Sequence, residues 1–321
     1  MPDLTRRVSA FRKSDWLRAG VLCILVCILV LLTSTARPSV LVAVPFLLLV
    51  GTNALRGYAI LGATLIAIII VMAGPYDGMW YLERGWALLL GGCFVGLSIV
   101  RPKMKISDRA LEAVFGALVL VAILMTLMSG AWNIVDWVIS DRVRATVAQA
   151  IALVAQVIAL GGSEGLAPAL MTAFYQTAEV RILIFPALTA LASMSALLLS
   201  WWLFIFFSGR SEEAFGSVEN FRFNDHLIWM LVVGIFLLFT RWSEPLQRLG
   251  SNAVVFIGAL CAVRGAAVIV FITGGFSVLG YAMTLLGLVI VPPIVLGGAV
   301  LIGIADIYLD FRKRSEQLAA R

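Results

Sequence analysis

One arginine stands in the middle of an otherwise apolar stretch, and its position makes it the residue best placed to do chemistry. Arg264 lies between Asn252 and Thr273, in a segment whose other residues are almost all apolar. An arginine at the centre of a membrane span costs roughly 2.5–3.5 kcal/mol on insertion scales, so something must offset its charge. The options are a carboxylate, backbone carbonyls, an anionic ligand, or snorkelling to the membrane surface.

Three other polar residues accompany Arg264 in a ligand-binding hypothesis. Asn252 begins the same segment, whereas Glu164 and Glu179 belong to the region 130–181. Either glutamate would supply a carboxylate for Arg264, or the same groups would surround an anionic ligand. The candidate ligand-binding residues are therefore Arg264, Asn252, Glu164 and Glu179.

The last apolar segment ends in alternating acids and bases. Asp306, Asp310 and Arg314 follow one another at intervals of four residues, which on a helix forms a ladder of ion pairs. Arg312 and Lys313 add two further cations. The simpler interpretation of Asp306, Asp310 and Arg312 is structural, and the alternative is a site that couples the chain to a cytoplasmic partner.

Asp306 is predicted not to be the partner of Arg264. If the segments 252–273 and 278–308 are antiparallel helices, Arg264 lies about 14 Å from the connecting turn and Asp306 about 45 Å, at a rise of about 1.5 Å per residue. Pro292-Pro293 interrupts the second segment and opens backbone carbonyls there, which sometimes marks a binding site.

Several kinds of chemistry lack the residues that they need. The chain has no Walker loop, so ATP hydrolysis by that route is not expected. His226 is the only histidine, and it stands at the end of an apolar segment without the partners of a metal site or a catalytic dyad. We predict no enzymatic activity, no catalytic or metal-binding residue and no cofactor.

The elements that position these residues are predicted to be membrane helices. Hydrophobic residues make up 62% of the chain and charged residues 13%, with a mean hydropathy of +1.03. Soluble domains are nearer half apolar and a quarter charged. Basic residues precede the first apolar segment and follow the last, which is typical of cytoplasmic flanks and not of nucleic-acid binding.

The predicted fold is therefore all-α, a polytopic transmembrane helical bundle of about eight to ten spans. Residues 1–321 form one integral membrane domain, with a basic cytoplasmic N-terminus at 1–18 and a cytoplasmic tail at 312–321. The predicted spans are 21–32, 40–50, 58–73, 86–100, 110–129, 182–207, 226–240, 252–273 and 278–308, with 143–160 as a further candidate.

Residues 130–181 admit two interpretations. A stripe of small and polar residues at helical spacing predicts a face packed on other helices, and 143–160 then crosses the membrane. Alternatively the segment is a helix that lies in the membrane interface. The stripe consists of Ala145, Gln149, Ala152, Gln156 and Ala159.

The distribution of charge helps to choose the number of spans. Nine spans with a cytoplasmic N-terminus would leave the basic end 312–314 outside, against the positive-inside rule. Ten spans, with 143–160 crossing, place both termini in the cytoplasm, the acidic loop 209–225 outside and 241–250 inside. Failure of 40–50 to cross also restores the parity but moves a basic loop outside, so we prefer ten.

The C-terminal part carries a resemblance. The run Arg-Gly-Ala-Ala-Val-Ile-Val-Phe at 264–271 and the ending Gly303-x-x-Asp306-x-x-x-Asp310-Phe311-Arg312-Lys313 are similar to the end of the YybS-like family of bacterial predicted membrane proteins. Phe221-Arg222-Phe223 extends the likeness, which covers roughly 220–314. Members of that family often have glutamine where this chain has Arg264, so this position departs from the pattern.

That family resembles, more distantly, the S-components of energy-coupling-factor vitamin transporters and the rod-shape protein MreD. The first likeness implies an S-component-like core and a substrate-binding or transport role in the bacterial inner membrane. The second implies a non-transporting scaffold of the cell envelope. A polar cavity around Arg264 would favour the first role, and a filled bundle with an exposed apolar groove the second. The implied partners are the lipid bilayer, a small-molecule or anionic ligand, and other membrane or cytoplasmic proteins.

Overall fold

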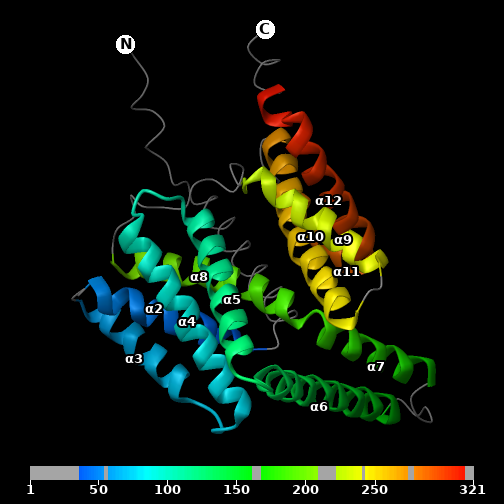
Figure 1. Cartoon of the computed structure of the whole chain (residues 1–321), viewed down its shortest axis with the longest axis horizontal. Coiled ribbons are helices and arrows are strands. Elements are labelled where there is room, and N and C mark those ends of the chain that lie inside the picture. The colour runs from blue at the N-terminus through cyan, green and yellow to red at the C-terminus, as the bar shows by residue number, and fades with distance from the viewer. Residues whose placement is uncertain are drawn as a thin grey trace.

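Among the residues that it describes, every element of the computed structural model is a helix, as the sequence predicts for an all-α bundle (Figure 1). The structure describes residues 36–53, 57–160, 168–208, 222–240, 243–273 and 278–314. The helices are α2 (Pro38–Asn53), α3 (Tyr58–Met72), α4 (Gly78–Val100), α5 (Ile106–Leu127), α6 (Ala131–Leu160), α7 (Pro168–Leu183), α8 (Phe185–Ser208), the short 3₁₀ helix η4 (Asp225–Leu227), α9 (Ile228–Thr240), α10 (Glu244–Ile272), α11 (Val278–Ile290) and α12 (Pro292–Leu309).

Within these ranges, five helices are long and apolar enough to cross a membrane: α4, α5, α8, α10 and α12. Shorter apolar helices cover Pro38–Asn53, Tyr58–Met72 and Asp225–Thr240. Many large apolar side chains on these helices are exposed, for example Leu65 on α3 and Leu301 on α12. This is the surface expected of helices whose solvent is lipid.

The helices form two bundles and an arm. The N-terminal bundle consists of α2, α3, α4, α5 and α8, and the C-terminal bundle consists of α9, α10, α11 and α12. One apolar core runs through both, because Phe94 and Leu197 of the first bundle and Leu260 of the second belong to the same buried cluster. The arm consists of α6 and α7, which pack on each other around a small separate core.

The arm differs from the packing that its sequence suggested. Residues 143–160 are the second half of the single helix α6, and the exposed stripe of Ala145, Gln149, Ala152 and Gln156 does not pack on other described helices. The packed face carries Ile139, Val143 and Val147 instead. Burying these larger side chains removes more apolar area from solvent than burying alanines does, so they decide which face turns inward.

The last predicted span, 278–308, is also two helices. Val291 leaves the helical region of backbone conformation, and Pro292 and Pro293 begin α12 rather than kinking a continuous helix. Proline suits the first turn of a helix, where its missing N–H leaves no hydrogen bond unmade. The chain turns back at this point, and α12 runs beside α10 in the same direction (Figure 1).

Candidate functional site

Arg264 lies at the centre of a buried ion-pair cluster in the C-terminal bundle. Its Nε donates a hydrogen bond to Oδ2 of Asp306 on α12 at 2.9 Å, and its Nη1 donates to Oδ1 of Asp225 in η4. The side chain of Arg264 is 3% exposed and that of Asp306 is 0% exposed, whereas Asp225 is 61% exposed. The ring of Phe223 lies 5.4 Å from the guanidinium carbon and covers a further side.

The prediction that Asp306 does not pair with Arg264 is therefore wrong. It assumed that 278–308 is one helix antiparallel to α10, which would hold the two residues far apart. Because the chain reverses at Val291, α12 is parallel to α10 and brings Asp306 to the level of Arg264. Arg264 faces the interior of the bundle, where its side chain is buried.

Two glycines allow α10 and α12 to approach closely enough for this pair. A Cβ added to Gly265 would lie 1.9 Å from the carbonyl oxygen of Ala299, and one added to Gly303 would lie 1.9 Å from that of Cys261. No real side-chain carbon tolerates such a distance, so both positions require glycine. Small residues at a helix crossing are the usual means of close packing between membrane helices.

A second layer of charges covers the end of this cluster. Asp310, which caps α12 in a left-handed conformation, accepts a hydrogen bond from Arg222 at 2.8 Å and is paired with Lys313 at 2.9 Å. The hydrogen bond from Lys313 holds the pKa of Asp310 below its ordinary value; Arg222 acts in the same direction and burial opposes both. Burial lowers the pKa of Arg312, and the negative charge of Asp306 opposes this shift.

The residues predicted for a ligand site are not all gathered at Arg264. Asn252 uses its amide at the break between α7 and α8: it donates to the carbonyl of Leu183 at 3.0 Å and accepts from the N–H of Ala187 at 2.8 Å. Glu179 lies on the exposed surface of the arm, where Arg144 donates to it at 3.3 Å. Glu164 lies outside the described residues.

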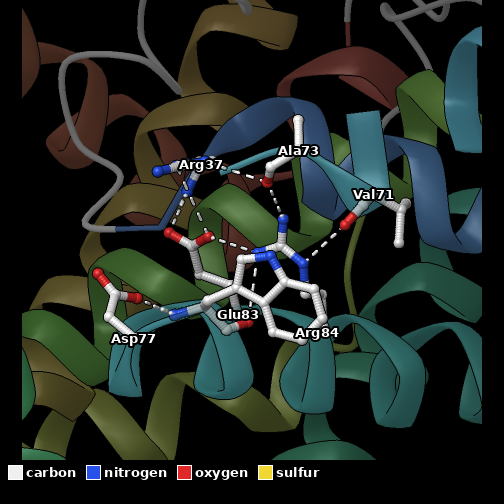
Figure 2. Close-up of polar contacts among 7 residues, drawn as sticks. Arg37, Val71, Ala73, Asp77, Glu83 and Arg84 are labelled. Atoms are coloured by element: carbon white, nitrogen blue, oxygen red, sulfur yellow. Dashed lines mark hydrogen bonds and ion pairs between the residues drawn. The ribbon is translucent and has the colours of Figure 1, made fainter. Parts of the chain in front are cut away.

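A separate charged cluster, which sequence reasoning missed, lies at the end of the N-terminal bundle where α3 ends and α4 begins (Figure 2). Arg84 on α4 donates to the carbonyls of Val71 and Ala73, each at 2.8 Å, and so satisfies the C-terminal end of α3. Buried Glu83 accepts from the backbone N–H of Arg37 at 3.0 Å and lies 3.3 Å from Arg84. A cation at a helix C-terminus is favourable because unpaired carbonyls gather there.

The signal for this second cluster was the Glu-Arg pair at 83–84 beside an apolar segment. The predicted span starts at residue Trp86, whereas α4 begins at Gly78, with Asp77 accepting from the N–H of Trp80 at 2.7 Å. The earlier start puts both charges inside the first turns of the helix. Asp225 was also missed as a partner, because the sequence drew attention only to its neighbour His226.

The chemistry available to the Arg264 cluster is electrostatic. Two carboxylates hold one guanidinium, and only Asp225 is open to exchange with solvent or with an anion. Within the described ranges, no three histidine, cysteine, aspartate or glutamate side chains are grouped as a metal ion would need. The arrangement therefore suits fastening helices together or recognising a charged group.

Comparisons with known proteins agree with the membrane character of the helices. No curated protein and no solved structure matches the chain. A family model described as "Predicted membrane protein (DUF2232)" matches residues 19–307, which is most of the chain and covers the arm and both bundles except the last two residues of α12. The chain therefore belongs to this family of predicted membrane proteins.

Proposed function

We propose that this protein is a multi-pass scaffold or assembly protein of the bacterial cytoplasmic membrane, which acts by contact with other membrane components and not by covalent chemistry. The observation that carries the proposal is that Arg264 is already occupied. Its guanidinium is held by Asp306 and Asp225 against a close helix crossing, so the centre of the C-terminal bundle is filled by the protein's own side chains.

An apolar groove on the outside of the same helix pair supports this role. It has a volume of about 420 Å³ and opens between α10 and α12, towards the surface where lipid or a partner helix would lie. A filled interior with an exposed apolar groove is the combination expected of a scaffold. The groove is lined by Val268, Ile269, Ile272, Leu301, Ile302, Ala305 and Phe311.

Photo-crosslinking in living cells tests the scaffold role. A photoreactive amino acid replaces Leu301 in the groove, and the matched control replaces Leu65 on α3, which is 60% exposed against 69% for Leu301. We expect a discrete protein adduct from position 301 and lipid adducts alone from position 65. Lipid adducts alone from both positions would remove the support for a protein partner at this groove.

A transport component similar to S-components is the second candidate, and one observation favours it. Asp225 is 61% exposed although the arginine that it contacts is buried, so an anionic ligand arriving from that side would replace one exposed carboxylate and leave Asp306 in position. In this case Arg264→Gln should fold but lose the stabilisation that an anion gives, and Arg264→Lys should recover part of it. Thermal melts with phosphate and with acetate measure this.

We further propose that both termini face the cytoplasm and that the chain has no intrinsic ATPase activity. Basic residues gather at 1–18, 101–109 and 312–314. Figure 1 draws the connection from α4 to α5 and the end of α12 towards the same, upper end, which supports one basic, cytoplasmic face. ATP turnover by purified protein that is free of contaminating ATPase would contradict the proposal that the chain has no intrinsic ATPase activity.

A further inference from the structure

The arm joins the molecule at the ends of helices that are able to span a membrane. At one end, α6 follows the last residue of α5 after a three-residue turn that includes Gly130 at φ +82°. At the other end, α7 passes into α8 through the single residue Ile184. The arm therefore begins where one apolar helix ends and finishes where another begins.

Two more apolar helices begin at the same level. Gly78, the first residue of α4, faces α6 so closely that an added Cβ would lie 3.2 Å from a methyl group of Val138. Near the start of α10, Arg248 donates hydrogen bonds to Asp136 of α6 and to the carbonyl of Ile182 at 3.0 Å. One end of each of α4, α5 and α10 thus meets the arm, so these three ends mark one surface of the membrane.

The arm runs across α10 and α12, whereas α8 continues from α7 in much the same direction (Figure 1). Figure 1 shows α6 and α7 side by side across the lower end of the molecule, while α10 and α12 rise from that end. If α10 and α12 cross the bilayer, α6 and α7 run close to its plane. A helix in this orientation does not reach the opposite surface, whatever its length.

The charges of α6 fit this position and fit a crossing poorly. Asp141, Arg142 and Arg144 lie near the middle of the helix, and all three are exposed. In a helix that crosses along its whole length they would lie deep in hydrocarbon, where each costs roughly 2.5–3.5 kcal/mol. In a helix that lies along the surface they remain at the depth of the lipid headgroups.

Aromatic side chains of the arm support the same depth. Trp137 is 69% exposed and Tyr175 is 55% exposed. Trp132 stacks on Phe185 at 5.8 Å, and Arg248 lies over both rings at 5.0 and 5.4 Å. Tryptophan and tyrosine are enriched at the boundary between hydrocarbon and water, because their rings are apolar and their polar atoms need partners.

From these observations we infer that the α6–α7 arm lies in the plane of the membrane, at the surface where α4 and α10 begin and α5 ends, with the lipid headgroup layer as its partner. Arg248 and Asn252, which lie one helical turn apart on α10, hold the arm in place. Arg248 donates hydrogen bonds to the early part of α6 and to the end of α7, and Asn252 is hydrogen-bonded to both sides of the break between α7 and α8. The inference holds for either proposed role, because it rests on the position of the helix ends.

Spin-label depth along two helices tests the inference. Single cysteines replace Arg142, Gln149 and Gln156 in a chain whose four native cysteines have been replaced, because these exposed positions recur every seven residues on one face of α6. The matched control series is Ile294, Leu301 and Tyr308 on α12, which has the same spacing and exposures of 71%, 69% and 73%. Each series spans 14 residues, or about 21 Å along a helix.

The full-length protein is reconstituted into vesicles of phosphatidylethanolamine and phosphatidylglycerol that contain a nickel chelate on a lipid headgroup. Only labelled chains that melt like the cysteine-free protein are used. We expect strong nickel relaxation at all three positions of α6, and on α12 weak relaxation at Leu301 between stronger values at its two ends.

A profile on α6 that falls towards the middle or one end, as on α12, would show that α6 enters the hydrocarbon. Weak relaxation by headgroup nickel at all three positions, with full access to a water-soluble nickel complex, would show that the arm stands away from the membrane. Either result overturns the inference.

Discussion

At the scale of single residues, the two carboxylates that contact Arg264 differ in exposure, and the difference decides what a substitution costs. Asp306 is completely buried and Asp225 is mostly exposed. Replacing Arg264 with leucine would leave the Asp306 carboxylate buried without its cation. We expect Arg264→Leu to lower the free energy of unfolding by on the order of 3–5 kcal/mol, as is usual when one member of a buried pair is removed. Denaturant unfolding in detergent measures the loss.

An exposed arginine in a similar pair provides the control. Arg101 contacts Glu112 at 3.1 Å, with the two side chains 61% and 45% exposed. Solvent screens such a pair, so Arg101→Leu should cost about 0–1 kcal/mol. Equal losses for the two variants would mean that the pair between Arg264 and Asp306 adds no more than a surface contact.

The lowered pKa of Asp310 predicts how its contribution changes with pH. The pKa of Asp310 is lower in the folded state than in the unfolded state, where it is about 3.9. Its carboxylate therefore stabilises the fold fully when the pH is above the unfolded pKa, and this stabilisation is lost as the pH falls through the folded pKa. The difference in melting temperature between the native protein and Asp310→Asn should therefore be constant from pH 7 to about 5 and shrink below about 4. A difference that persists unchanged to pH 3 would contradict the assignment of the shift to Lys313 and Arg222.

At the scale of elements, the close crossing of α10 and α12 depends on Gly265. A second glycine on α10, Gly258, lies away from the crossing and provides a comparison within the same helix. A Cβ on Gly265 would overlap the carbonyl of Ala299, whereas a Cβ on Gly258 would meet no atom within 4 Å. We expect Gly265→Ala to separate the two helices, weaken the hydrogen bond from Arg264 to Asp306, and cost at least the 1–3 kcal/mol typical of overpacking. Gly258→Ala should be neutral or stabilising by up to about 1 kcal/mol, since alanine favours helix more than glycine does.

Thermal unfolding of the two alanine variants, measured side by side, checks this expectation. Circular dichroism before heating should show equal helix content, so that any difference reflects packing between helices. If Gly265→Ala melts at the temperature of Gly258→Ala, then α10 and α12 do not cross as closely as the structure describes.

The same helix pair illustrates what the sequence allowed us to predict. Hydropathy located α2, α3, α5, α8 and α9 to within about four residues at each end, because a run of apolar side chains is a local property, and the unusual charge of Arg264 marked the buried site. The partner of Arg264 was beyond this reasoning, because pairing depends on the relative direction of two helices. That direction was set by Pro292 and Pro293, which fit both a kink inside one span and the first turn of a new helix.

At the scale of the whole molecule, the arm and the reversal at Val291 change which loops share a membrane surface. Ten spans with 143–160 crossing would place the start of α10 in the cytoplasm. If the arm stays in the membrane plane and α11 and α12 cross separately, both termini remain cytoplasmic, but the start of α10 moves to the outside. The loop 101–105 is cytoplasmic in both arrangements.

Ser243 decides between these arrangements, because it is exposed and immediately precedes α10. In a cysteine-free chain in intact cells, we expect Ser243→Cys to react with a membrane-impermeant maleimide. Lys103→Cys and Ala320→Cys should react only after the cells are permeabilised, because basic flanks of spans are retained in the cytoplasm. Tyr76→Cys, which is 64% exposed in the connection between α3 and α4, serves as the positive control for outside labelling. Protection of Ser243→Cys in intact cells, with normal labelling of Tyr76→Cys, would mean that an odd number of crossings separates α5 from α10. Either the arm then crosses the membrane, or one of α8 and α9 does not.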